Sequence, residues 1–257
     1  MPASEGRASR LAALARAYAG RVWRSVELQS RIATMGLVDS LAEQDRLEAL
    51  LDGAKPRYRP GTEGLHYLLK TPFRYKPFDR WGSRFSRPHG HGLFYAAEAR
   101  RTALAETTFY RLLFLAGPEE PRLPATKVTY TLFTVDVAAP QAIDLTLPPL
   151  AADADRWTDL TELTHTQSLG EAAREAGLDA IRYRSVRDPD GGAALALLTP
   201  CFASGIGAQE TWHLSLLPAE AALYRDGGGG GEVFAYAWFL RDPRLAPLAP
   251  LLERAVP

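Results

Sequence analysis

Residues 72–106 read PFRYKPFDRWGSRFSRPHGHGLFYAAEARRTALAE and combine clustered arginines with aromatic rings, glycines and a carboxylate. After residue 92 the loop pattern changes to a short strand over 93–96 and then to a helix over 98–115. On that helix Glu106 falls between Ala103 and Tyr110 at helical spacing, where an apolar side chain is expected. A buried carboxylate needs a partner or a task, so the stretch predicts either a structural ion pair or half of a functional site.

The composition is that of an ordinary globular protein, with 46% hydrophobic and 23% charged residues among 257. Thirty basic residues balance thirty acidic ones, which gives no overall attraction to nucleic acid or to a membrane surface. The single cysteine, Cys201, excludes an internal disulfide and favours a reducing cytoplasm; we interpret it as a buried thiol. We recognise neither a signal peptide nor a membrane-spanning run, so we expect no membrane partner.

The chain before residue 61 is predicted to be a helical N-terminal segment, with one helix over 4–24 and another over 37–52. Residues 61–257 form the second predicted unit, in which strands and helices alternate. Its expected elements are a short helix or turn over 63–70, strands over 127–137 and 142–145, a helix over 169–176, strands over 178–186 and 194–199, and strands over 211–217 and 232–240. The class is therefore α+β, and Gly227–Gly231 is interpreted as a loop tip rather than a phosphate cradle.

Ser185 is the second residue that the pattern singles out. On the strand over 178–186 it is in phase with Ile181 and Tyr183, so its hydroxyl leaves an apolar face just before the turn DPDGG at 188–192. A nucleophile elbow of the form G-x-S-x-G is absent around it, which favours a role in positioning a substrate. The two strands that flank this turn are expected to form a hairpin.

Three other side chains are candidates for binding. Arg74 and Arg84 flank a loop punctuated by Pro77 and Gly82, and constrained guanidinium groups suit recognition of phosphate or carboxylate. Tyr95 ends an apolar strand, where its ring could either stack on a substrate or pack in the core.

The remaining arginines of the stretch, at positions 80, 87, 100 and 101, are interpreted as surface charges. His89 and His91 lie in PHGHG, but no second cluster of ligands accompanies them, so no metal site is predicted.

At these residues the chain resembles the RES-domain family, which is named for its Arg, Glu and Ser. The matching pieces, in order, are Arg74 in PFRY, Arg84 in GSRF, Tyr95 in LFYAAE, Glu106 in ALAE and Ser185 in YRSVRD. Eleven residues separate Arg84 from Tyr95, and eleven separate Tyr95 from Glu106, as is typical of the family. The resemblance covers roughly residues 65–217. It departs from the family at Gly-Ser-Arg-Phe, where Gly-Gly-Arg-Trp is common.

The resemblance implies a fold like that of the diphtheria-toxin-type ADP-ribosyltransferases, with a mixed, largely antiparallel β core flanked by helices. It also implies a toxin of a toxin–antitoxin pair that uses NAD as its substrate. Glu106 would stabilise the charge that develops on the ribose, and Arg74 and Arg84 would hold the pyrophosphate. Tyr95 would stack near the nicotinamide ribose, and Ser185 would bind the nicotinamide half.

The partner implied by the resemblance is an antitoxin of the Xre/ParS-like helix-turn-helix kind, and nucleic acid would be reached only through it. The acceptor of ADP-ribose stays open between a target protein, phosphate and water, and the resemblance also allows a homodimer. The alternative to an enzyme is a RES-fold binding module whose site has lost its activity. An RNA-directed toxin is disfavoured by the neutral net charge.

Overall fold

The computed structural model describes residues 3–28, 58–74, 82–124 and 126–253, together with a few isolated positions between 40 and 53. The described strands are β1 (Arg16–Glu27), β2 (Phe94–Ala97), β3 (Val128–Asp144), β4 (Ala180–Arg184), β5 (Ala193–Leu197), β6 (Gln209–Leu216), β7 (Glu220–Arg225) and β8 (Gly231–Ala235). The described helices are α1 (Ala3–Leu14), α4 (Tyr67–Arg74), α5 (Arg100–Ala116), α6 (Ala154–Thr158), α7 (Thr164–Glu175), α8 (Tyr236–Phe239) and α9 (Ala249–Glu253), with 3₁₀ turns η1 (Leu150–Asp153) and η2 (Pro243–Leu248).

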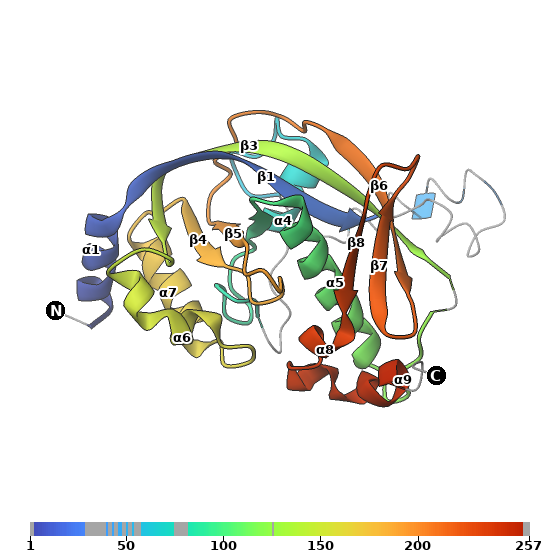
Figure 1. Cartoon of the computed structure of the whole chain (residues 1–257). Helices are drawn as coiled ribbons and strands as arrows, with labels where there is room; N and C mark the ends of the chain where they lie inside the picture. The colour runs from blue at the N-terminus through green and yellow to red at the C-terminus, as the bar shows by residue number, and fades with distance from the viewer. Residues whose placement is uncertain are drawn as a thin grey trace.

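The long strand β3 organises the sheet, because it carries different strands at its two ends. Its first half pairs with β6, and its last three residues pair in parallel with β4. Nine residues separate these two ladders, from Phe133 to Ala142, which is about 30 Å of extended chain. Two groups of strands, β2–β5–β4 and β6–β7–β8, therefore hang from opposite ends of β3, with α5 between them (Figure 1).

Strand β1 pairs with the edge of β3 that β6 and β4 leave free. It also pairs with β2, which closes the first group of strands into a ring. It runs antiparallel to β3 from the Tyr18–Ala139 pair to the Glu27–Tyr130 pair. Trp23 of β1 also pairs with Ala97 of β2, so β1, β2, β5, β4 and β3 close on themselves. β1 and β3 form the arch at the top of Figure 1.

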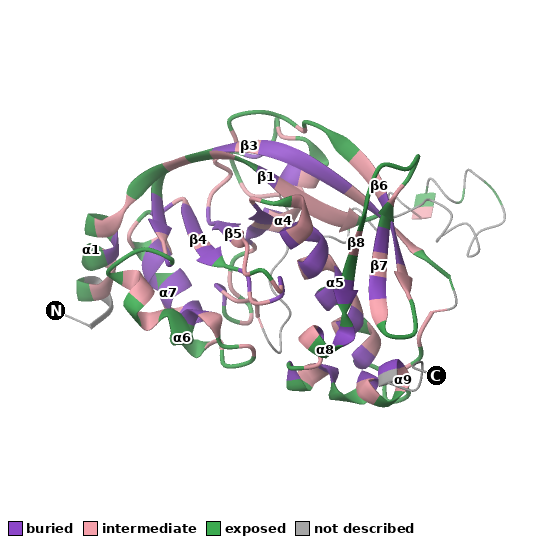
Figure 2. Ribbon diagram, in the orientation of Figure 1, coloured by how far each residue is buried: buried purple, intermediate pink, exposed green. Residues whose placement is uncertain are grey.

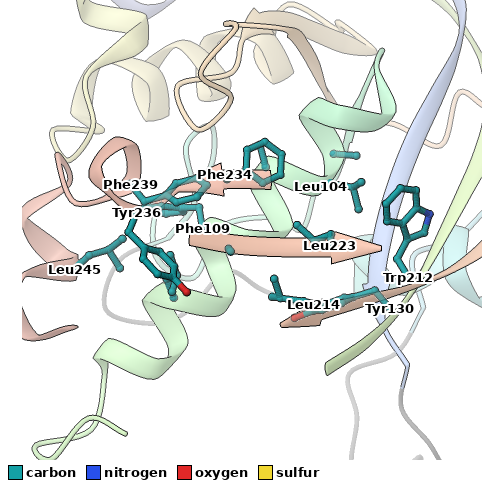
Figure 3. Close-up of a cluster of buried hydrophobic side chains, with 14 of the residues drawn as sticks. Leu104, Phe109, Tyr130, Trp212, Leu214, Leu223, Phe234, Tyr236, Phe239 and Leu245 are labelled. Atoms are coloured by element: carbon teal, nitrogen blue, oxygen red, sulfur yellow. The ribbon is translucent and has the colours of Figure 1, made fainter. Parts of the chain in front are cut away.

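Helix α5 packs its apolar face on the β6–β7–β8 group. Its buried residues include Leu104, Phe109 and Leu112, and the facing strands contribute Leu223 and Phe234 (Figure 3). The side chains of α8 and η2 close the far side of this cluster, which includes Phe239 and Leu245. Burial on this scale fixes the direction of α5 and hence the position of every side chain on its other face.

The β4–β5 hairpin is buried on both faces, as Figure 2 shows in purple. Ile181, Tyr183 and Ala196 point toward α7 and Phe85, whereas Leu195 and Leu197 point toward a second cluster beneath α4. This alternation is the period of two that an extended strand imposes. It confirms the predicted hairpin and its phase.

The predicted α+β class with a largely antiparallel sheet is confirmed, since β3 and β4 form the one parallel pair among the strands that the structure describes. Strands predicted over 93–96, 178–186, 194–199 and 211–217 are present with shifted ends, as are the helices predicted over 98–115 and 169–176. The helix predicted over 63–70 extends to Arg74 and includes Pro72.

Three sequence predictions are wrong, and one strand was missed. The helix predicted over 4–24 ends at Leu14, and Arg16–Glu27 is a strand because it pairs along β3. Strands predicted separately over 127–137 and 142–145 are one strand. The strand predicted over 232–240 ends at Ala235 and continues as α8, and β7 was not predicted at all.

Two predictions concern the chain before residue 61. The helix predicted over 37–52 lies largely outside the described residues. The boundary at residue 60 stays a prediction, although β1 belongs to the same sheet as the strands that follow this boundary.

The glycine run Gly227–Gly231 connects the β7–β8 hairpin, which agrees with its interpretation as a loop tip. Gly227, Gly228, Gly229 and Gly230 all have positive φ, a region that favours glycine. In the part of the chain that the structure describes, none of the helices has the length and apolarity that a transmembrane segment needs.

We expect Leu104→Ala to lower the free energy of unfolding by about 2–5 kcal/mol, because it opens a cavity beneath α5 where Leu104 is fully buried. Urea denaturation of the full chain measures the loss. Leu147→Ala is the matched control, since half of that side chain is exposed and its truncation should cost less than about 0.5 kcal/mol. Equal losses in the two variants would contradict the assigned core.

Candidate functional site

Glu106 and Ser185 meet between the two groups of strands. Glu106 projects from the face of α5 that does not pack on β6–β8, and Ser185 follows the last residue of β4. The Ser185 hydroxyl donates a hydrogen bond of 2.6 Å to Oε1 of Glu106. Its oxygen also accepts hydrogen bonds of 3.2 Å from the backbone N–H groups of Arg187 and Asp188. The sequence prediction that these two residues belong to one site is consistent with this geometry.

The turn after Ser185 is fastened to the start of α5. Asp188 is buried and accepts a 2.6 Å hydrogen bond from the Thr102 hydroxyl, together with backbone N–H groups of Asp190 and Gly192. A Cβ on Gly192 would lie 2.1 Å from Oγ1 of Thr102, so the turn approaches the helix too closely for any side chain there. Both ends of the Glu106–Ser185 contact are thus anchored on the same helix.

Glu106 is half-buried as a residue, and the surrounding protein raises the pKa of its carboxyl group. Burial is the largest cause, and the hydrogen bond from Ser185 and the charges of Arg187 and Arg84 act in the opposite direction. Desolvation raises the pKa of a carboxyl group because it disfavours the charged form. Such perturbed groups concentrate at functional sites.

Arg84 is held by backbone oxygens rather than by a carboxylate. Its guanidinium donates hydrogen bonds of 2.9 Å to the carbonyl of Trp157 and 3.1 Å to that of Asp159. Among the residues that the structure describes, it forms no ion pair. Its charge lowers the pKa of Glu106, Tyr95 and Asp159, so this cation lies in the same electrostatic neighbourhood as Glu106.

Tyr95 anchors the loop that carries Arg84. Its hydroxyl lies 2.9 Å from Oγ of Ser83 and accepts a hydrogen bond of 3.2 Å from the backbone N–H of Phe85. Burial raises the pKa of Tyr95 to about 12, so the hydroxyl stays protonated. In this structure Tyr95 shapes the Arg84 loop, and its ring belongs to the cluster under α7.

The same loop packs against α7 at a glycine. A Cβ on Gly170 would lie 2.1 Å from the carbonyl oxygen of Phe85, so only glycine allows this approach. Gln167, one turn earlier on α7, donates a hydrogen bond of 3.2 Å to the carbonyl of Ser83. Contacts with helix α7 therefore fix the position of the loop that carries Arg84.

Arg74 is placed differently from the other candidates. It is buried at the end of α4, and its guanidinium lies 4.3 Å from the centre of the Tyr58 ring. The hydrogen bond between Ser185 and Glu106 and the charge of Arg84 on Glu106 and Tyr95 connect these four residues, whereas the contact described for Arg74 is with Tyr58.

Three of the four arginines interpreted as surface charges form ion pairs, and Arg80 lies outside the described residues. The Arg87–Glu171 pair is exposed, whereas Arg100 and Arg101 are half-buried and pair with Glu210 and with Asp190 and Glu232. The thiol of Cys201 is partly buried, and burial raises its pKa to about 11. Among the described residues, His, Cys, Asp and Glu side chains do not gather in the threes that a metal site requires.

Sequence reasoning missed Arg187, which lies in the same segment as Ser185. Its buried guanidinium pairs with Asp242 at 2.8 Å, donates to the carbonyl of Leu160 at 3.1 Å and lies 3.7 Å from the centre of the Phe109 ring. Its charge lowers the pKa of Glu106 against the effect of burial. The available signal was a second arginine two residues after the serine in YRSVRD.

Tyr110 and Tyr183 were also missed as neighbours of Glu106. Tyr110 lies one turn further along α5 and is 57% exposed, which corrects the expectation of an apolar, inward-facing neighbour. Tyr183 is buried, and it precedes Ser185 by two positions in the sequence. Burial and then the charge of Glu106 raise the pKa of Tyr183.

The comparisons with known proteins identify the family. The model of the RES domain matches residues 56–216, and the chain therefore belongs to the RES-domain family. No curated protein matches the chain. A solved structure described as that of the M. tuberculosis MbcT–MbcA toxin–antitoxin complex is similar at 15% sequence identity with a TM-score of 0.45, covering 93% of this chain and 97% of the other.

Glu106→Gln should become more stable relative to the parent protein as the pH rises from about 3.5 to 7. Below the ordinary glutamate pKa of about 4.3, Glu106 is protonated in both the folded and the unfolded chain. Above it, the unfolded chain releases this proton first, because folding raises the pKa, so ionisation works against folding. Melting temperatures of the two proteins across this range test the trend.

The matched control is Glu120→Gln, because Glu120 is 84% exposed and its described ion-pair partner is Arg122. This variant should not reproduce the trend expected of Glu106→Gln. A pH-independent difference for Glu106→Gln would show that the carboxyl group is not destabilised by its surroundings.

Gly170→Ala should lower the free energy of unfolding by about 1–3 kcal/mol, because the added methyl group collides with the backbone of Phe85. Thermal or urea denaturation measures the loss. Gly6→Ala in α1 is the control, since nothing lies within 4 Å of its added Cβ and alanine favours the helix. Equal tolerance at both positions would contradict the close approach of the Arg84 loop to α7.

Proposed function

We propose that this protein is an NAD-consuming toxin of a toxin–antitoxin pair. It cleaves the bond between nicotinamide and ribose and passes ADP-ribose to a protein, to phosphate or to water. The observation that carries the proposal is the Glu106 carboxyl group, which Ser185 holds at 2.6 Å within a domain of the RES family. The guanidinium of Arg84, which two backbone carbonyls hold and whose charge acts on Glu106, supports an anionic substrate.

The reaction needs a negative charge where Glu106 lies. When nicotinamide departs with the electrons of the carbon–nitrogen bond, positive charge develops on the ribose carbon, as it does in glycoside cleavage. A fixed carboxylate beside that carbon stabilises this charge without reorganising. The acceptor oxygen then forms the new bond to the carbon and loses its proton. Ser185, Arg187 and Arg84 favour the ionised form of Glu106 against the effect of burial.

The remaining candidates receive roles that fit their surroundings. Arg84 binds the pyrophosphate with the guanidinium N–H groups that the carbonyls of Trp157 and Asp159 leave free. Ser185 positions the nicotinamide half by way of Glu106, and Tyr95 lies near the nicotinamide ribose while its hydroxyl holds the Arg84 loop. Arg74 contributes a second charge for the pyrophosphate.

The partner we propose is an antitoxin of the Xre/ParS-like helix-turn-helix kind. In the bacterial cytoplasm it would cover the site formed by Glu106 and Ser185. Tyr110 and Phe114 follow Glu106 on the same face of α5 at successive turns, and they are 57% and 70% exposed. Large exposed rings next to a functional carboxylate suit burial by a protein partner. Contact with nucleic acid would then be made by the antitoxin.

We expect the purified protein to release nicotinamide from NAD, and Glu106→Gln to reduce the rate by about 10²–10³-fold, because the amide keeps the hydrogen bond from Ser185 and loses the charge. Chromatography of the products, with and without phosphate, identifies the acceptor. Glu120→Gln, which changes an exposed carboxylate of the same kind, should keep full activity.

The alternative is a non-catalytic RES-fold binding module. It becomes the better description if the parent protein releases no nicotinamide even when a cell extract supplies protein acceptors. If Glu106→Gln keeps the full activity, the protein is still an enzyme, but Glu106 is not one of its catalytic residues.

A further inference from the structure

A cavity of about 620 Å³ lies at the other end of the β4–β5 hairpin from Ser185. Arg184 pairs with Ala193 beside Ser185, whereas Ala180 pairs with Leu197 beside the cavity. Four residues of extended chain, roughly 13 Å, separate these two pairs along β4. The cavity is lined by Tyr58, Arg59, Pro60, Phe73, His91, Gly92, Arg174, Gly177, Leu178, Leu198 and Thr199.

Two guanidinium groups enter this cavity, and backbone carbonyls hold both of them. Arg59 donates a hydrogen bond of 2.7 Å to the carbonyl of Leu198, at the end of β5. Arg174, in the last turn of α7, donates one of 3.3 Å to the carbonyl of His91. Each arginine therefore keeps most of its N–H donors for another partner.

The positive charges of this pair are not neutralised. Across the described ranges, neither Arg59 nor Arg174 forms an ion pair with Asp or Glu. Burial, and then the charge of Arg59, lower the pKa of Arg174 to about 10. Two like charges in partly desolvated surroundings are costly unless an anion lies between them.

The surroundings add positive charge at the cavity wall. Lys70 and Arg74 lie 4.4 Å and 4.3 Å from the centre of the Tyr58 ring, which lines the cavity. The carboxylate of Asp179 reaches the edge of the cavity, but it accepts hydrogen bonds from the Thr199 hydroxyl and from the backbone N–H of Gln141.

We propose that this cavity binds a phosphate group, with Arg59 and Arg174 as its ligands. Planar guanidinium groups present paired N–H donors that match the oxygens of phosphate. The volume leaves room for the rest of a small phosphate ester beside the aromatic ring of Phe73. This cavity is separate from the Glu106–Ser185 site, and phosphate binding in it does not depend on the reaction proposed for that site.

Thermal denaturation in inorganic phosphate and in chloride at equal ionic strength tests the site. We expect phosphate at ten times its dissociation constant to raise the melting temperature by about 3 °C through selective binding to the folded chain. Arg174→Ala and Arg59→Ala should each abolish the part of this shift that exceeds the general effect of phosphate on proteins. Arg122→Ala, at an arginine that is 84% exposed, should retain the whole shift.

Arg84→Ala distinguishes phosphate binding in this cavity from binding at the Glu106–Ser185 site. The rise in melting temperature that phosphate causes should persist in this variant. Ribose 5-phosphate is the second probe: tighter binding than inorganic phosphate points to an ester, and equal binding points to free phosphate. Broadening of the phosphorus NMR signal is the second readout, and it should be weaker for Arg174→Ala than for the unmodified protein.

The proposal is overturned by the absence of both a specific shift and broadening. The proposal is also overturned if Arg84→Ala loses the phosphate-induced rise in melting temperature while Arg174→Ala keeps it. If Arg174→Ala does not fold, Arg174→Gln replaces it with a neutral side chain that keeps a donor to the carbonyl of His91.

Discussion

The ladder between β1 and β3 is the interaction on which the rest of the fold depends. Because β1 occupies one edge of β3 over most of its length, the other edge alone remains for β6 and β4. These two strands take opposite ends of that edge, and the sheet divides into two groups. Every feature of the Glu106 site follows from this division, since the site lies where side chains from the two groups meet.

Each half of the site is built by a different hydrophobic cluster. The cluster between α5 and β6–β8 orients Glu106, while the cluster between α7 and the β4–β5 hairpin sets Ser185 and the Arg84 loop. The hydrogen bond between Ser185 and Glu106 joins these clusters, and the contact of Thr102 with Asp188 holds them in register. Polar contacts thus position the site, and apolar burial supplies the stability that lets a carboxylate remain partly desolvated.

Local pattern was enough to place Glu106 on its helix and Ser185 at the end of its strand, because helical spacing and strand alternation decide which residues share a face. It failed at β1 and β7, because the segments RAYAGRVWRSVE and EAALYR become strands through pairing with β3 and β6 rather than through a local pattern. It could not place Arg84 either. The partners of Arg84 are carbonyls of the loop at 157–159, more than seventy residues away, and no side-chain pattern records them.

The hydroxyl of Ser185 is fully occupied. Its proton goes to Glu106, and its oxygen receives two backbone N–H groups, so no lone pair is left to attack an electrophile. Fluorophosphonate labels, which report nucleophilic serines, should therefore not modify Ser185. This serine connects a turn to a carboxylate, and covalent inhibitors designed for nucleophilic serines should not react with it.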